Sequence, residues 1–314
     1  MALDKENLRE RLAGLASQGV LVGTSSWKYP GWLGMVYDEA RYLWRGKFAK
    51  SRFEKDCLAE YAQLFKTVCV DAAYYTFPSR ESLEALASQV PADFQFAFKV
   101  TDEITVKRFP DLPRFAQRAG TPNPNFLNGD IFQDQFLEPC QSIRSHVGLL
   151  IFEFSRFHIG DFQHGRDFVS ALDAFLDKLP KGWPYGIEMR NQRWLRPEYF
   201  ACLARHKVTH VFNSWTEMPT VAAQLALPDS RPNPELVAAR FLLTPGRKYA
   251  QAVQDFSPYA SVKETDQNAR NAGAALILEG KKSAQRKTFL LVNNRLEGNA
   301  PHTIQAMLDL SIDG

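Results

Sequence analysis

The chain has 314 residues, of which 45% are hydrophobic and 23% are charged, and its formal net charge is +3. This composition is ordinary for a globular protein. The small net charge argues against a protein dedicated to nucleic acid, because such domains are usually strongly basic.

Short apolar runs, each ending in polar residues, recur along the chain and alternate with segments of helical periodicity. In chain order we predict a helix over 5–17, a strand at Leu21–Ser25, a helix over 56–65, a strand at Val68–Asp71, a helix over 80–89, a strand at Phe94–Thr101, a helix over 132–145, a strand at Val147–Glu153, a helix over 166–179, a strand at Pro184–Arg190, a helix over 197–206, strands at Thr209–Asn213 and Val237–Leu242, a helix over 262–280, a strand at Phe289–Asn294 and a closing helix over 301–311.

Eight strands, most of them separated by helices, predict an α/β fold, a single (β/α)8 TIM-like barrel with elaborated loops. We expect one domain over 1–314, with an N-terminal helix within 1–19 and the barrel over 20–311. Long loops are expected at 27–50, 102–131 and 214–236, and residues 245–260 also have a loop-like composition.

The cysteines and the N-terminus indicate the compartment. Cys57, Cys69, Cys140 and Cys202 form no CxxC pair, so we expect buried free thiols and a reducing environment. The first 19 residues are charged and lack the apolar segment of a secretion signal. No run of about 18 apolar residues exists, so no membrane span is expected. We predict a cytoplasmic protein, and the sequence gives no oligomeric state.

Polar side chains collect at the predicted carboxyl ends of the strands, where active sites of this architecture lie. Because strand residues alternate between two faces, Glu188 and Arg190 share a face, and Lys99 and Asp71 lie on the mixed polar faces of their strands, which should point into the barrel. The candidate catalytic residues are Glu188, Lys99 and Asp71, and the candidate ligand-binding residues are Trp27, Tyr75, Glu153, Arg190, Asn213, Arg240, Asn293 and Asn294.

These groups also have structural interpretations. Glu188 and Arg190 could instead form a structural ion pair inside the barrel. Asn293 and Asn294 suit the capping of a turn. The aromatic loop that begins at Trp27 suits packing on the barrel rim.

Three functions remain open at this point. The leading one is an enzyme acting on a small anionic or sugar-phosphate-like ligand, with Glu188 as general acid/base and Lys99 and Arg190 holding the anion. The second is a protein that binds or processes nucleic acid, because aromatic and basic residues alternate over 27–47. The third is a non-catalytic binding barrel. No P-loop, GxGxxG, GxSxG or HExxH motif occurs.

No cofactor is predicted, and a divalent metal is the alternative. The one histidine-containing cluster suggested by the sequence combines Glu153, His158, Asp161 and His164 after the fourth strand. His210 lies in the middle of a strand on its apolar face, so we expect it to be a core residue.

Five short motifs occur in a fixed order: Gly23-Thr-Ser-Ser-Trp27, Asp71-Ala-Ala-Tyr-Tyr75, Phe96-Ala-Phe-Lys99, Ile187-Glu-Met-Arg190 with Trp194, and Val292-Asn-Asn294. With them the chain resembles the YecE-like family, also called domain of unknown function 72. The resemblance covers about residues 20–311 and implies a TIM-like barrel, but no activity. The chain departs from the pattern at Glu153-Phe-Ser-Arg156, where the family commonly has Gln-Leu-Pro-Pro, and after Arg240, where it often has a histidine. The segment around 118–131 is also long for the family.

Overall fold

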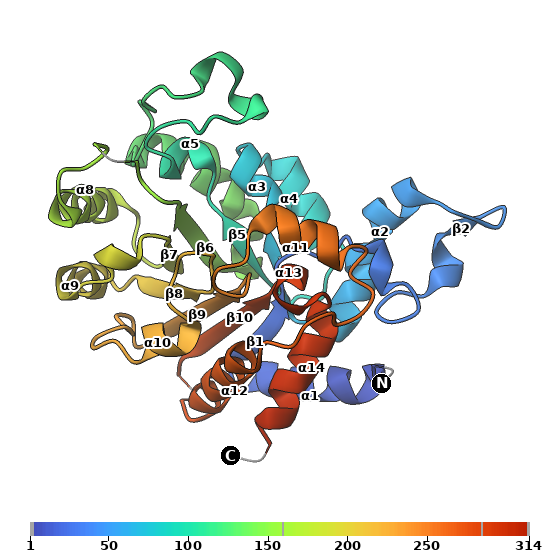
Figure 1. The fold of residues 1–314 in the computed structure, drawn as a ribbon. Coiled ribbons are helices and arrows are strands. Elements are labelled where there is room, and N and C mark those ends of the chain that lie inside the picture. The colour runs from blue at the N-terminus through green and yellow to red at the C-terminus, as the bar shows by residue number, and fades with distance from the viewer. Residues whose placement is uncertain (1–2, 159, 284, 313–314) are drawn as a thin grey trace.

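The central feature of the fold is a closed barrel of eight parallel strands (Figure 1). The computed structural model describes residues 3–158, 160–283 and 285–312. The barrel strands are β1 (Val20–Thr24), β4 (Thr67–Val70), β5 (Gln95–Lys99), β6 (Val147–Phe154), β7 (Tyr185–Met189), β8 (Thr209–Asn213), β9 (Leu236–Phe241) and β10 (Lys287–Val292). They pair in sequence order, and β1 closes the ring against both β10 and β4. The predicted (β/α)8 architecture is confirmed.

Helices surround this barrel (Figure 1). They are α1 (Lys5–Ser17), α2 (Lys50–Leu64), α3 (Ala72–Tyr75), α4 (Arg80–Ala87), α5 (Asp102–Thr105), α6 (Gly129–Phe132), α7 (Glu138–Cys140), α8 (Gly165–Lys178), α9 (Pro197–Arg205), α10 (Val221–Leu225), α11 (Tyr249–Phe256), α12 (Gln267–Lys281), α13 (Asn294–Glu297) and α14 (Ala300–Leu310). Within the described residues, none of them is long and apolar enough to cross a bilayer.

Short 3-10 or π helices and one small hairpin complete the described elements. These helices are η1 (Pro30–Trp32), η2 (Glu39–Tyr42), η3 (Pro113–Arg118), η4 (Gln133–Leu137), η5 (Gln141–His146) and η6 (Gln192–Trp194). The hairpin joins β2 (Leu43–Trp44) to β3 (Lys47–Phe48) and projects from the barrel beside α2 (Figure 1). The long predicted loops therefore contain short elements.

The barrel interior is apolar below its mouth. Ten buried side chains, contributed by strands around the ring, form one cluster there: Leu21, Cys69, Ala97, Leu149, Ile151, Val211, Leu236, Ala238, Phe289 and Leu291. Phe94, Phe96 and Phe98 of the same ring belong instead to the outer core under the helices. This division matches the predicted alternation of faces, and it places the charged residues in the layer above the apolar one.

Two glycines are required by close approaches between strands. A Cβ on Gly23 would lie 2.0 Å from the carbonyl oxygen of Thr67, at the seam where β1 meets β4. A Cβ on Gly186 would lie 2.8 Å from Cγ2 of Val211, inside the barrel. Gly186 thus leaves room for the apolar layer directly below Glu188.

Two predicted segments differ from the structure. The expected helix over 132–145 is broken into η4, α7 and η5, because Pro139 has no backbone N–H to continue the ladder and Ile143 has non-helical dihedral angles. The segment 245–260 was expected to be a loop but contains α11, whose Ala252 and Phe256 are buried in a small apolar cluster. The stability of such a short helix comes from tertiary packing rather than from local helix propensity.

Candidate functional site

The carboxyl ends of five strands bring six charged side chains to one mouth of the barrel. Lys99 ends β5, Glu153 lies near the end of β6 and Arg240 near the end of β9, while Asp71 and Arg190 directly follow β4 and β7. Glu188 of β7 is the register partner of Glu153. Two carboxylates placed directly opposite each other repel, so their pairing requires cations between them.

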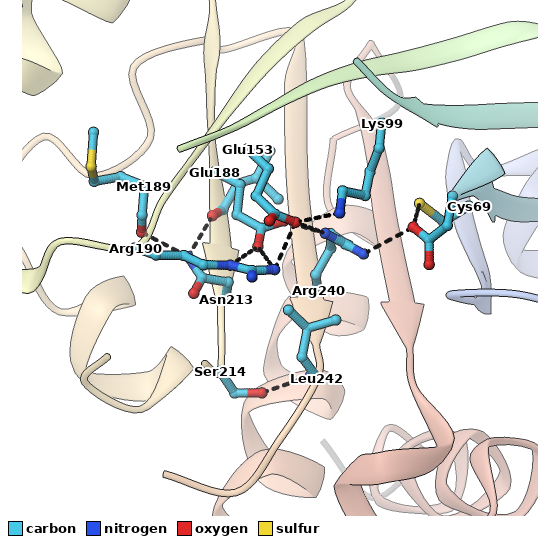
Figure 2. Close-up of polar contacts among 12 residues, drawn as sticks. Cys69, Lys99, Glu153, Glu188, Met189, Arg190, Asn213, Ser214, Arg240 and Leu242 are labelled. Carbon is cyan, nitrogen blue, oxygen red and sulfur yellow. Dashed lines mark hydrogen bonds and ion pairs between the residues drawn. The ribbon is translucent and has the colours of Figure 1, made fainter. Parts of the chain in front are cut away.

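Glu153 is the hub of the resulting network (Figure 2). Its Oε2 atom lies 2.7 Å from Nζ of Lys99, 2.7 Å from Nη2 of Arg190 and 3.3 Å from Nη1 of Arg240. All four side chains are buried. Three cations on one buried carboxylate compensate for its removal from water.

Glu188 completes the link between the two arginines (Figure 2). Its Oε1 atom accepts a hydrogen bond from Nε of Arg190 at 2.8 Å, and its Oε2 atom accepts one from Nη1 of Arg240 at 2.6 Å. Both carboxylate oxygens are therefore engaged, and the side chain is fully buried. This arrangement suits a residue that holds the arginines in place.

Asp71 is bound more loosely than the other two carboxylates. Its Oδ1 atom lies 3.6 Å from Nη2 of Arg240, beyond hydrogen-bond distance, and its side chain is 39% exposed. The thiol of Cys69 lies 3.7 Å from the same Oδ1 atom. Asp71 is thus the carboxylate of the network that faces solvent.

The charge states of the network follow from these contacts. Burial raises the pKa of Glu153, but Arg190, Lys99 and Arg240 lower it by more, so it lies well below its ordinary value. Burial lowers the pKa of Lys99, but Glu153 and Asp71 raise it by more, so it lies above its ordinary value. Glu153 is therefore a carboxylate and Lys99 an ammonium group at neutral pH.

Two aromatic residues of the site were missed by the sequence analysis. The ring of Tyr74 lies 3.7 Å from Nζ of Lys99, and the ring of Trp215 lies 3.8 Å from Cζ of Arg190. Both contacts are cation–π interactions. An aromatic residue within four positions after a predicted strand was the available signal, but the sequence analysis selected Tyr75 instead.

Tyr75 and Trp27 lie outside the charge network. Tyr75 is 59% exposed and borders a separate cavity of about 340 Å³, with its ring 5.0 Å from Cζ of Arg114. Trp27 is buried, and its backbone carbonyl accepts a hydrogen bond from the hydroxyl of Tyr37. Trp27 therefore packs in the core, whereas its structural interpretation expected packing on the barrel rim.

The three predicted asparagines serve the backbone. Asn213 is buried beside the arginines, and its Nδ2 atom donates to the carbonyl of Met189 at 3.1 Å. Asn293 caps α13 by accepting from the backbone N–H of Arg295. Asn294 accepts from the backbone N–H of Ala300 at 2.7 Å. Asn293 and Asn294 therefore stabilise helix starts, while Nδ2 of Asn294 and Oδ1 of Asn213 are buried without a hydrogen-bond partner among the described residues.

The groups of the suggested histidine cluster have other partners. Asp161 accepts from the backbone N–H of His158 and pairs with Arg108, while His164 caps α8. In the described part of the chain, no three ligand atoms of this cluster lie together as a metal site requires. His210 is buried among aromatic rings, as expected.

A larger hollow lies at the opposite end of the barrel. It has a volume of about 700 Å³ and is bordered by the amino ends of β6, β7, β9 and β10, with Lys181, Lys207 and Lys287 on its rim. In barrels of this type the amino-terminal face normally serves stability, so cavity size alone does not locate the active site. The convergence of charged side chains favours the mouth at the carboxyl ends of the strands as the functional site.

Comparison with known proteins assigns the chain to a family. The model of the family described as "Protein of unknown function DUF72" matches residues 21–312. The chain belongs to the DUF72 family. No curated protein matches.

Solved DUF72 structures share the fold. A DUF72 protein from Enterococcus faecalis V583, solved at 3.10 Å, is 19% identical with a TM-score of 0.62, over 93% of this chain and 95% of that chain. A second structure from the same organism, at 2.52 Å, is 18% identical with a TM-score of 0.60, over 93% and 96%. A DUF72 protein from Thermotoga maritima MSB8 is 19% identical with a TM-score of 0.55, over 94% and 99%.

In this DUF72 protein, the two departures noted in the sequence fall on the charge network. Glu153, the hub, begins the stretch that differs after the fourth predicted strand, and Arg240 precedes the other.

Proposed function

We propose that this DUF72 protein is an enzyme that binds a small anionic ligand, such as a sugar phosphate, at the barrel mouth. The observation that carries the proposal is the convergence of Lys99, Arg190 and Arg240 around two buried carboxylates. Such a cluster holds cationic groups in fixed positions before a ligand arrives, which lowers the cost of binding.

The arginines keep donors that the network does not use. Arg190 bonds through Nε and Nη2, which leaves Nη1 without a partner among the described residues. Arg240 bonds through Nη1, and its Nη2 atom has only the long 3.6 Å contact with Asp71. Planar guanidinium groups suit phosphate and carboxylate oxygens. We infer that an anion would approach the arginines on the side of Asp71, which is the exposed carboxylate of the network.

The carboxylates then have different roles. Glu153 and Glu188 position the cations, because both are buried and occupied by them. This replaces the expected role of Glu188 as general acid/base. Asp71 is accessible and loosely held, so we assign proton transfer to Asp71.

Two substitutions that should change anion affinity in opposite directions test the proposal. Calorimetric titration with inorganic phosphate and a panel of sugar phosphates should show saturable binding. Lys99→Met should weaken it about tenfold or more, because a charged hydrogen bond contributes about 1.5–3 kcal/mol. Asp71→Asn should strengthen it, because a competing negative charge is removed.

The control is Lys181→Met, which removes a positive charge at the other end of the barrel. It should leave binding unchanged. Absence of saturable binding, or equal weakening by Lys99→Met and Lys181→Met, would contradict the proposal. Once a substrate is found, Asp71→Asn should abolish turnover while binding persists; undiminished turnover would refute the role of Asp71.

The nucleic-acid alternative has one observation in its favour. Trp44, on the β2–β3 hairpin, is 60% exposed, and the guanidinium carbons of Arg45 and Arg52 lie 5.9 and 5.5 Å from its ring centre. An exposed ring beside cations suits stacking on a base. A gel shift with single-stranded RNA that weakens with salt and is lost in Trp44→Ala would favour this function over the small ligand.

A further inference from the structure

Three side chains able to ligate a metal meet on the outside of the barrel, away from the mouth. They are Asp173 of α8, Cys202 of α9 and His206, the residue that follows α9. The Oδ1 atom of Asp173 lies 2.7 Å from Nε2 of His206 and 3.7 Å from Sγ of Cys202. All three ligand atoms lie within 4.8 Å of one another, and no second cluster of this kind occurs in the described residues.

The local sequence explains this convergence. Cys202 and His206 are four residues apart, so they lie on the same face of α9 one turn apart. Helix α8 packs against α9 and brings Asp173 to that face. The Cys-x3-His spacing was visible in the sequence, but its partner is 29 residues away from Cys202 and became recognisable only through the packing of the two helices.

One of the separations already matches a tetrahedral metal centre, and a second is shorter than such a centre requires. Zinc binds cysteine sulfur at about 2.3 Å, histidine nitrogen at about 2.0–2.1 Å and carboxylate oxygen at about 2.0–2.2 Å. Tetrahedral angles then place sulfur about 3.6 Å from oxygen and nitrogen about 3.3 Å from oxygen. The observed 3.7 Å already matches the first separation, and the 2.7 Å hydrogen bond must open by about 0.6 Å.

We propose that Asp173, Cys202 and His206 form a zinc-binding site with a fourth position open to water. The mixed sulfur, nitrogen and oxygen donors favour Zn²⁺ over Mg²⁺ or Ca²⁺, which prefer oxygen alone. Binding replaces the proton of the Cys202 thiol with the metal, and that proton leaves to solvent. His206 also borders the 700 Å³ cavity at the amino-terminal face of the barrel, so the site lies at the edge of a space of the size that small-molecule pockets have.

Arg205 is the group that opposes the metal. Its Nη2 atom donates to Oδ1 of Asp173 at 2.8 Å, so it occupies a ligand atom and adds a positive charge. Its side chain is 56% exposed and is free to turn toward solvent. Removing this guanidinium should therefore strengthen metal binding, whereas a purely structural ion pair predicts no such gain.

Cobalt is the probe for the test, because Co²⁺ occupies zinc sites and its bond to a thiolate absorbs in the near ultraviolet. Titration of the full chain, purified free of metal, should give one strong thiolate-to-cobalt band per chain, and one equivalent of Zn²⁺ should remove it. Cys202→Ala should abolish the band. Asp173→Asn, at a side chain 40% exposed, should weaken cobalt affinity about 10- to 100-fold or more, since even the loss of a residue that supports a ligand costs that much.

Two variants complete the design. Arg205→Gln should tighten cobalt binding several-fold. Cys140→Ala, which removes another buried thiol, should leave the titration unchanged. Absence of the band, or a band that persists in Cys202→Ala, would overturn the proposal. Equal affinity in Asp173→Asn and the unaltered protein would overturn it as well, and so would binding that is not tightened in Arg205→Gln.

Discussion

Replacing Arg240 with methionine tests whether the buried charges at the mouth form one interdependent network. The change removes a guanidinium that lies 2.6 Å from Glu188 and 3.3 Å from Glu153. Loss of one partner of a buried ion pair costs about 3–5 kcal/mol. Glu188 keeps Arg190, and Glu153 keeps Arg190 and Lys99, so we expect the lower end, about 3 kcal/mol, in the free energy of unfolding.

Urea unfolding followed by tryptophan fluorescence measures this loss through the transition midpoint and slope. The double variant Arg240→Met/Glu188→Gln should lose at least about 1 kcal/mol less than the sum of the two single variants, because the pair is coupled. The control is Arg156→Met, which breaks an exposed pair with Glu217 and should cost less than about 1 kcal/mol. Equal effects of Arg240→Met and Arg156→Met, or additive losses in the double variant, would refute the reasoning.

Three further predictions concern pH and packing. Because the pKa of Glu153 is depressed in the folded state, its stabilising contribution is present above pH 4.5 and is lost as the pH falls below that value. The free energy of unfolding of Glu153→Gln should therefore decline less steeply with acid below pH 4.5 than that of the unaltered protein. Burial lowers the pKa of His210 from 6.5 to about 4, so the free energy of unfolding should decline by up to about 3 kcal/mol as the pH falls from 6.5 to 4. His210→Gln should flatten this decline, and an unchanged slope in that variant would contradict the prediction. Gly23→Ala should lower the thermal midpoint by the equivalent of about 3 kcal/mol, because its Cβ would meet the carbonyl oxygen of Thr67 at 2.0 Å. Gly14→Ala, in an open position of α1, should instead raise the free energy of unfolding by about 0.5–1 kcal/mol. Similar effects of the two changes would contradict the packing argument.

The sequence predicted the barrel because its signal is local and repeated. Each strand carries period-two or fully apolar patterning that needs no knowledge of the other strands. The helix α11 and the break at Pro139 were missed for different reasons. The first depends on burial of Phe256 against distant residues, and the second on how the chain continues after a proline, which periodicity does not reveal.

The convergence of Asp71, Lys99, Glu188 and Arg190 was predictable from strand ends, because parallel strands of a barrel end at one rim. Their roles were not. Only distances reveal that both oxygens of Glu188 are occupied, and that Asp71 is the exposed carboxylate.

Residues beyond the strand ends follow the dihedral angles of the loops rather than the pleat. For this reason Tyr74, and not Tyr75, lies over Lys99, and Trp27 packs in the core instead of lining the mouth. Patterns of alternation carry no information about such positions.

The central claim is that the cations at the barrel mouth form an anion site. A crystal structure of the protein soaked in inorganic phosphate tests it directly. We predict a phosphate ion within hydrogen-bond distance of Nη1 of Arg190 and Nη2 of Arg240, with Asp71 turned away from it. A mouth without phosphate, with Asp71 still beside Arg240, or arginines directed to separate surfaces, would contradict the account.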